Sequence, residues 1–110
     1  MPAFAGDPVN DLALFFVGAF FCNCIPHLAA GLMGMPFPTP FARPRGVGNS
    51  SPLTNFLWGA LNFAAGVYLL STHPFALGPN VETLAVAVGA LLLGSYLAVH
   101  FGHVRRPAKP

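Results

Sequence analysis

The side chains best suited to chemistry in this chain lie inside long apolar stretches. His27 stands in a segment that contains no charged residue, and an ionisable side chain in such a segment is a candidate functional group. Imidazole can exchange a proton, bind a metal ion or hydrogen-bond a ligand near neutral pH. It can equally be a structural residue that bonds to Asn55 or to a backbone carbonyl freed by Pro26. The sequence leaves both roles open.

The two cysteines are poorly placed for either a disulfide or a metal site. Cys22 and Cys24 are two residues apart, which on a helix turns their side chains roughly 200° away from each other. Cys24 and His27 share a face at i and i+3, but two ligands without a third or fourth partner do not make a typical metal centre. We therefore predict no metal site and interpret the cysteines as packing residues.

The motifs of common enzyme classes are missing from the sequence. The apolar stretches hold no Asp or Glu except Glu82 at the edge of the last one, which removes the acid partner of a nucleophile and the carboxylates of a proton pump. Phosphate-binding, dinucleotide-binding and zinc-protease patterns are also absent. The sequence therefore favours a binding or assembly role over an enzyme.

The elements that must position these residues follow from composition. The chain is 55% hydrophobic and 7% charged, whereas a soluble domain is about 25% charged. Long gaps between charged residues contain apolar runs at about 12–35, 53–70 and 81–103, and a helix needs about 20 such residues to cross a bilayer. We predict an all-α integral membrane protein in which residues 1–110 form one domain with three membrane-spanning helices.

The basic residues predict the orientation of the three spans. Arg43 and Arg45 follow the first span, and Arg105, Arg106 and Lys109 follow the third. Three crossings place both groups on one side, and short cytoplasmic segments retain Lys and Arg. We therefore predict an outside N-terminus, a cytoplasmic C-terminus and a first span that is retained as an anchor. Abundant Ala, Gly and Pro and the preference for Arg over Lys suggest a bacterial, multi-pass inner-membrane protein.

Each predicted span carries a polar or small-residue face on a helical wheel. The second span gathers such residues within an arc of about 100°, namely Asn55, Trp58, Gly59, Asn62 and Gly66. The first span gathers Asn23, Cys24, His27, Ala30, Gly31 and Gly34. The third span has one side with Gly89, Tyr96, His100 and His103 and an opposite stripe with Ala90, Gly94, Ala98 and Gly102.

Unpaired polar groups are costly in hydrocarbon, so these faces should turn away from lipid. We expect a polar pocket that opens toward the cytoplasm, with six candidate ligand-binding residues: His27, Asn55, Trp58, Asn62, Tyr96 and His100. The stripe on the third span has the spacing that lets helix backbones approach closely. We interpret Ala90, Gly94, Ala98 and Gly102 as a helix-packing interface with a second copy or another subunit.

The connection 36–52 is rich in proline, which excludes a regular helix and favours extended backbone. Phe37 and Phe41 are unusual in a solvated linker, and we expect them to dock at the membrane surface or over the bundle mouth as a lid. Ser50 or Ser51 is expected to cap the second span. The alternative is a basic interfacial loop held against anionic headgroups by its two arginines.

The leading functional hypothesis is an accessory or self-associating membrane subunit whose pocket binds a lipid headgroup, a quinone or a pigment. One alternative is a membrane-embedded redox subunit or enzyme that acts on a lipid-soluble substrate or binds non-covalent haem through His27 and His100. Another is a small oligomeric channel. The expected partners are membrane lipids and either further copies or a larger membrane complex, with no nucleic acid.

Overall fold

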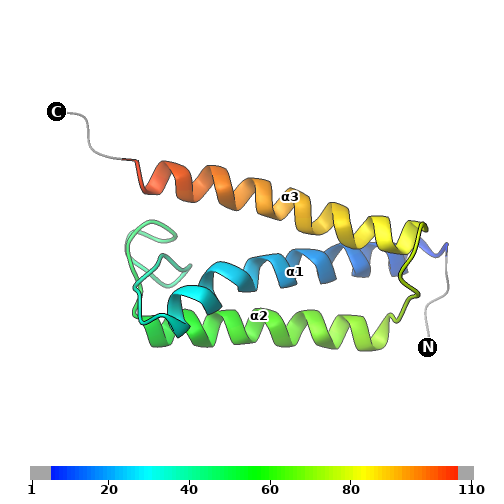
Figure 1. The fold of residues 1–110 in the computed structure, drawn as a ribbon, viewed down its shortest axis with the longest axis horizontal. Coiled ribbons are helices and arrows are strands. Elements are labelled where there is room, and N and C mark those ends of the chain that lie inside the picture. The colour runs from blue at the N-terminus through cyan, green and yellow to red at the C-terminus, as the bar shows by residue number, and fades with distance from the viewer. Residues whose placement is uncertain (1–5, 107–110) are drawn as a thin grey trace.

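The protein forms three long helices joined by one long and one short connection (Figure 1). The computed structural model describes residues 6–106, and Lys109 lies outside that range. Helix α1 spans Pro8–Leu32, α2 spans Pro52–Thr72 and α3 spans Val81–Val104. All three helices are long and apolar enough to cross a membrane. The all-α prediction is confirmed, and the length and composition of the helices fit a membrane protein.

Each helix begins at a side-chain cap that satisfies a free backbone N–H of its first turn. Asp7 accepts from the N–H of Val9 at 3.0 Å, and Ser51 accepts from that of Thr54 at 3.1 Å. Asn80 accepts from the N–H of Thr83 at 2.8 Å. Proline occupies the first turn of α1 and α2, where its missing N–H costs nothing. The predicted Ser51 cap is thereby confirmed.

Helix α1 ends earlier than the apolar run that predicted it. Gly34 has a φ of +69°, a left-handed conformation that glycine adopts without steric cost. It lets the N–H of Met35 reach the carbonyl of Ala30 at 2.8 Å and its own N–H reach Gly31 at 3.1 Å, which is a Schellman ending. Pro26 lies inside α1 without breaking it.

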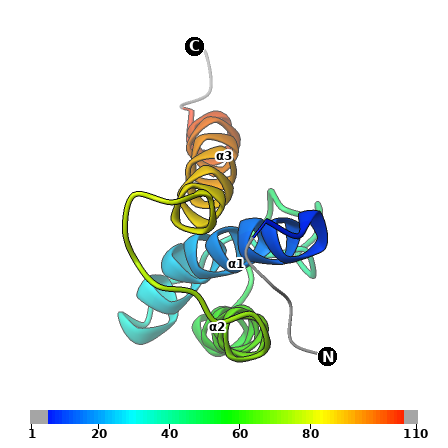
Figure 2. The same ribbon diagram turned by 90° about the vertical axis from the view of Figure 1, so that its right-hand side faces the viewer.

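Helix α1 occupies the middle of the molecule, with α2 on one side and α3 on another (Figures 1 and 2). It packs against both neighbours, while no Cα atoms of α2 and α3 come within 8 Å of each other. The amide side chains that α2 turns inward bond to α1, to the 36–52 connection or to the backbone of α2 itself.

Glycines let α1 and α3 approach backbone to backbone. A Cβ on Gly89 would collide with the backbone of Phe15, and a Cβ on Gly18 would collide with the carbonyl of Val86. The crossing point is therefore reciprocal, with a glycine from each helix against the other's main chain. Such contacts are favoured in membranes because lipid tails give apolar side chains no reason to associate.

The face of α2 that packs on α1 is the face predicted from the helical wheel. The buried residues of α2 are Asn55, Gly59, Asn62 and Gly66. A Cβ on Gly59 would press on Leu28, and one on Gly66 would press on the ring of Phe21. Polar and small residues thus fill one seam between α1 and α2, and Leu53, Leu57 and Leu61 of α2 are exposed.

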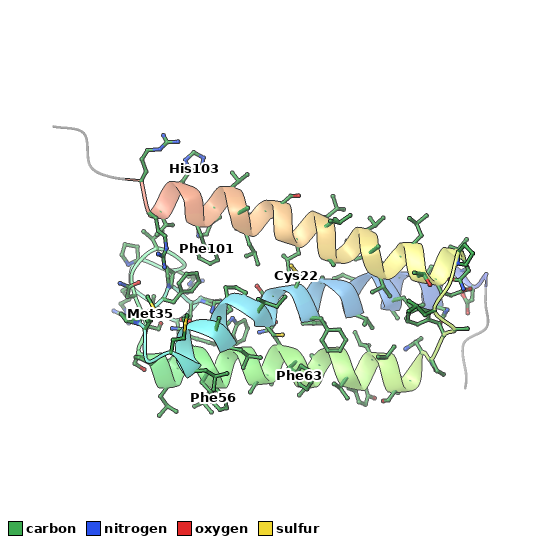
Figure 3. The ribbon with its side chains drawn as sticks, viewed as in Figure 1. Cys22, Met35, Phe56, Phe63, Phe101 and His103 are labelled. Atoms are coloured by element: carbon green, nitrogen blue, oxygen red, sulfur yellow. The ribbon has the colours of Figure 1, made fainter. Side chains whose placement is uncertain are left out.

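The small-residue stripe of α3 is divided in the structure. Gly94 faces Cys22 of α1, and the backbone of Ala90 lies beside Gly18. Ala98 and Gly102 are exposed, and open space surrounds Gly102. His103 is also exposed and points away from α1, whereas Phe101 points inward (Figure 3). The half of the stripe nearest the C-terminus is therefore free to meet another chain, and its predicted role there stays a prediction.

The 36–52 connection folds back on itself at the end of the bundle. Phe37 and Ser50 exchange two backbone hydrogen bonds, at 3.2 and 2.9 Å, and the hydroxyls of Thr39 and Ser50 bond to each other. Thr39 and Phe37 are buried, while Phe41 is exposed. The connection is thus an ordered cap over the helix ends, and one of its two phenylalanines is part of the interior.

Candidate functional site

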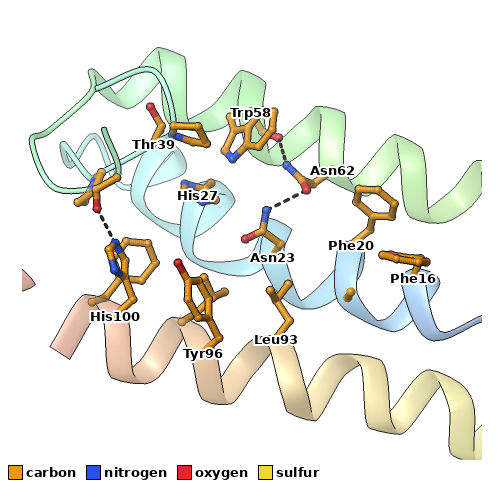
Figure 4. Close-up of a pocket in the computed structure, with 16 residues that line it drawn as sticks. Phe16, Phe20, Asn23, His27, Thr39, Trp58, Asn62, Leu93, Tyr96 and His100 are labelled. Atoms are coloured by element: carbon orange, nitrogen blue, oxygen red, sulfur yellow. Dashed lines mark hydrogen bonds between the residues drawn. The ribbon is translucent and has the colours of Figure 1, made fainter. Parts of the chain in front are cut away.

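A cavity of about 410 Å³ lies between α1, α3 and the 36–52 cap. Helix α2 contributes Trp58 and Asn62 to its wall (Figure 4). The two ends of the cavity differ in chemistry: Phe16 and Phe20 lie at one end, and His100 and Thr39 lie at the other (Figure 4). The cavity is partly open, so a bound molecule would keep one side in contact with the surroundings of the helices.

Asn55 lies behind the polar end of the cavity and is completely buried. Its Nδ2 donates to the carbonyls of Phe37 at 2.8 Å, Ser51 at 3.1 Å and Ser50 at 3.3 Å. Its Oδ1 lies 2.9 Å from Nδ1 of His27. We call Asn55, His27, Phe37, Ser50 and Ser51 the Asn55 cluster. It ties the first two helices to the cap through one side chain.

The cluster fixes which nitrogen of His27 carries the hydrogen. Backbone carbonyls only accept, so the three carbonyls identify the donor end of Asn55 as Nδ2. Oδ1 must then accept from Nδ1 of His27. A neutral imidazole in this arrangement presents its lone pair on Nε2. Nε2 has no hydrogen bond to another of residues 6–106, although His27 is 3% exposed and lines the cavity.

A second hydrogen-bond chain crosses the cavity wall from α1 to α2 (Figure 4). Nδ2 of Asn62 donates to the carbonyl of Trp58 at 2.8 Å, and Nδ2 of Asn23 donates to Oδ1 of Asn62 at 2.9 Å. The Trp58 carbonyl at the end of this hydrogen-bond chain can only accept, so it fixes the orientation of the amide groups of Asn62 and Asn23. Oδ1 of Asn23 is left as an acceptor on the wall.

Helix α3 brings Tyr96 and His100 to the opposite wall. Their rings are stacked, with centroids 5.8 Å apart and planes 5° apart. Nε2 of His100 lies 2.7 Å from the carbonyl oxygen of Gly46 in the cap, so the imidazole donates this bond. His100 therefore connects α3 to a residue that is 54 positions away in sequence.

Trp58 forms the part of the wall nearest to the cap. Phe41 meets the indole edge-on at 5.2 Å, and His27 meets it at 6.4 Å between centroids. The indole nitrogen is turned toward His27 (Figure 4). It is buried and has no hydrogen-bond partner within residues 6–106. A buried donor without an acceptor is costly, so an acceptor supplied by a bound molecule would stabilise this wall.

Five of the six residues predicted to bind a ligand line the cavity: His27, Trp58, Asn62, Tyr96 and His100. The sixth, Asn55, stands one layer behind and orients His27. Asn23, Phe16, Phe20 and Thr39 also line the cavity but were outside the predicted set. The polar face of the first span contained a signal for Asn23, whereas nothing in the sequence places Thr39 of the connection in the cavity wall. Ligand binding by the predicted residues stays a prediction.

No Asp, Glu, Lys or Arg lines this cavity within the described part of the chain. The guanidinium of Arg105 lies over the ring of Phe37, 5.3 Å from its centre, outside the cavity wall. Residues 6–106 contain no group of three or more His, Cys, Asp or Glu able to hold a metal ion.

Comparison of the sequence with protein-family models, with curated proteins and with solved structures found no match. The geometry and chemistry of the cavity therefore carry the functional inference.

Proposed function

We propose that this chain is a small bacterial inner-membrane protein that holds an amphipathic, lipid-soluble molecule in the cavity between α1, α3 and the 36–52 cap. The observation that supports this most is the polarity of the cavity, which has aromatic walls at one end and hydrogen-bonding groups at the other. Ligand sites in proteins typically combine a mostly apolar wall with a few placed polar groups. A lipid headgroup, a quinone or a pigment has the matching division into a polar and an apolar part.

The arrangement of the helices supports access from the membrane. Because no Cα atoms of α2 and α3 come within 8 Å of each other, these two helices do not pack together on the side where both flank α1. The apolar end of the cavity lies at Phe16 and Phe20, well inside α1, and the polar end lies at the cap. An amphipathic molecule can thus slide in from the bilayer with its polar group directed to the cap.

The role that fits such a site is that of an accessory or self-associating subunit. Helix α3 buries little of its surface within the chain, and exposed residues on it include Ala98 and Gly102. A second copy or a larger membrane complex would cover this surface. Self-association would also add walls to a cavity that three helices enclose only in part.

The proposed orientation places the cap and the polar end of the cavity on the cytoplasmic side. A fluorescent protein fused after Pro110 should be bright, and alkaline phosphatase fused at that point should be inactive. The reciprocal result is expected for fusions in the α2–α3 connection at 73–80, which the proposal places outside. Active phosphatase at the C-terminus would overturn the orientation.

A ligand should co-purify with the protein when native lipids are retained. We expect organic extracts of the protein in polymer nanodiscs to contain one enriched lipid-soluble species, identified by mass spectrometry against nanodiscs without the protein. Ala19 lines the cavity, whereas Ala29 on the same helix is exposed and does not. Ala19→Phe should therefore deplete the species at least tenfold, and Ala29→Phe should leave it unchanged.

Haem is a second candidate because His27 and His100 line the same cavity. Nε2 of His100 is engaged by the carbonyl of Gly46, so axial ligation through this nitrogen would break the bond between α3 and the cap. An absorbance spectrum of the purified protein separates the two candidates. A Soret band that disappears in His27→Ala would favour the haem-binding subunit.

A further inference from the structure

We infer that the polar end of the ligand is a neutral hydroxyl group on an aromatic ring, as in a phenol or a quinol, and that the cavity selects it over the corresponding carbonyl or ether. This inference rests on the proposed function and specifies the ligand class for the same cavity. The polar end of the cavity presents hydrogen-bond acceptors whose direction is fixed by the surrounding chain.

The first acceptor is Nε2 of His27. Three backbone carbonyls hold Nδ2 of Asn55, so Oδ1 of Asn55 faces His27 and takes the hydrogen of Nδ1. The ring cannot reverse its neutral tautomer without placing two acceptors against each other. Nε2 can therefore bond a ligand only if the ligand supplies a hydrogen.

The second acceptor is Oδ1 of Asn23, which is fixed by an independent chain. Asn62 donates to the carbonyl of Trp58 and accepts from Nδ2 of Asn23. Turning the amide of Asn23 around would put its oxygen against Oδ1 of Asn62. Both hydrogen-bond chains thus end on backbone carbonyls, and each leaves an acceptor on a residue that lines the cavity, His27 in one and Asn23 in the other.

The donors at this end are less firmly placed than the acceptors. Nε1 of Trp58 is shielded in its present position, so the indole must turn slightly to reach a ligand. The hydroxyl of Tyr96 can rotate and either donate or accept. A ligand hydroxyl can engage both kinds of group, because its one hydrogen goes to one of the acceptors while its oxygen receives the indole N–H. A carbonyl or an ether satisfies only the donors.

The charge of the wall argues for a neutral ligand. Among residues 6–106, no charged side chain lines the cavity. A phosphate or an ammonium group would enter without a counter-ion, and burying an unpaired charge costs far more than burying a hydroxyl that is hydrogen-bonded. A phospholipid headgroup is therefore disfavoured at this end.

The rings of the wall argue for an aromatic ligand body. Phe16, Phe20, Trp58, Tyr96 and Phe101 all line the cavity. Aromatic pairs in offset or edge-to-face contact add about 0.5–1.5 kcal/mol beyond the area that they bury. A flat ring can meet several of these side chains at once, with an alkyl chain extending past Phe16 and Phe20 into the bilayer.

The inference is tested with three probes that share an eight-carbon tail: 4-octylphenol, 4-octylanisole and 4-octylbenzylamine. The protein in nanodiscs is equilibrated with each probe, and the bound amount is measured by mass spectrometry after subtraction of partitioning into empty nanodiscs. We expect 4-octylphenol to bind about tenfold more tightly than 4-octylanisole, in which a methyl group replaces the donated hydrogen. The charged amine should bind more weakly than the phenol.

Variants assign the preference to the two acceptors. His27→Phe should reduce the ratio of the affinity for the phenol to the affinity for the anisole to about one, because it lowers the affinity for the phenol. His27 also belongs to the Asn55 cluster, so this variant can lose its fold. Asn23→Leu therefore provides a second measurement, and we expect it to reduce the affinity ratio in part. Ala29→Phe, exposed on the same helix, should leave the ratio unchanged.

The possible results separate the inference from the function on which it rests. The hydroxyl preference is overturned if phenol and anisole bind equally, or if the amine binds more tightly than the phenol. If Ala19→Phe blocks that binding, the cavity function still stands. A wild-type preference that survives in both His27→Phe and Asn23→Leu would also overturn the inference. If Ala19→Phe does not reduce the binding of any probe and no lipid-soluble species co-purifies with the protein, both the hydroxyl preference and the cavity function are overturned.

Discussion

Alanine in place of Asn55 is expected to lower the free energy of unfolding by about 3 kcal/mol. The three carbonyls that Asn55 bonds would lose one donor each, but the carbonyls of Phe37 and Ser50 keep the backbone donors of their bridge. The larger loss falls on His27, whose Nδ1–H would be left without its acceptor in a buried position. Removal of a completely buried side chain adds the loss of its packing contacts.

Asn55→Asp separates hydrogen bonding from packing. Aspartate preserves the volume of the side chain but replaces the donor Nδ2 with an acceptor that faces three carbonyl oxygens. It should therefore destabilise the protein at least as much as alanine does. Unfolding is measured by titrating SDS into detergent micelles and following far-ultraviolet circular dichroism. Asn80→Ala, which removes a helix cap at the other end of the bundle, is the matched control with an expected cost of about 1 kcal/mol. Equal effects at the two positions would contradict a special role for Asn55.

The second large effect is expected at the crossing of α1 and α3. Gly89→Leu should lower the free energy of unfolding by about 3 kcal/mol, because even the first carbon of the new side chain meets the backbone of Phe15. Backbone atoms cannot move aside as the end of a side chain can, so α3 must separate from α1. The same separation widens the cavity, and we expect the co-purified species to be lost as well.

Gly102→Ala is the control for this position because it lies on the same helix with open space around it. Alanine has the higher helix propensity by about 1 kcal/mol, so this variant should be neutral or slightly more stable. Thermal unfolding in detergent, monitored by circular dichroism, distinguishes the two variants. A Gly89→Leu protein with wild-type stability would show that α1 and α3 do not pack through this glycine. A changed oligomeric state of Gly102→Ala would instead reveal the predicted contact with another chain.

The sequence was sufficient to predict the helices because charged residues interrupt apolar runs of membrane-spanning length. It also predicted the inner face of α2, since its polar and small residues all lie on one side. The inner face of α3 was harder to predict, because this helix has small or polar residues on two sides. The face that meets α1 includes Gly89, Ala90 and Gly94, and so draws on both predicted sides.

Most of the contacts that could not be predicted from the sequence involve the 36–52 cap. Proline spacing excluded a helix in the connection 36–52, but the bond from His100 to Gly46 joins residues that no periodic pattern relates. The position of Asn55 behind the cavity has the same origin, because its three carbonyl partners belong to the cap and to the residue before α2. Contacts of this kind depend on the path of an irregular loop, and helical wheels contain no information about it.

The two outer helices, α2 and α3, each pack on α1 and not on each other, so they have different roles in this small protein. The hairpin of α1 and α2 with its connection contains all the hydrogen bonds of the Asn55 cluster. Helix α3 is attached through the glycine crossing, through the bond from His100 to the cap and through the ring of Phe101 against Phe37. It also supplies the remaining wall of the cavity. A motion of the last helix that opened the cavity would therefore break the contacts of Phe101 and His100 with the cap, while the hydrogen bonds of the Asn55 cluster could stay in place.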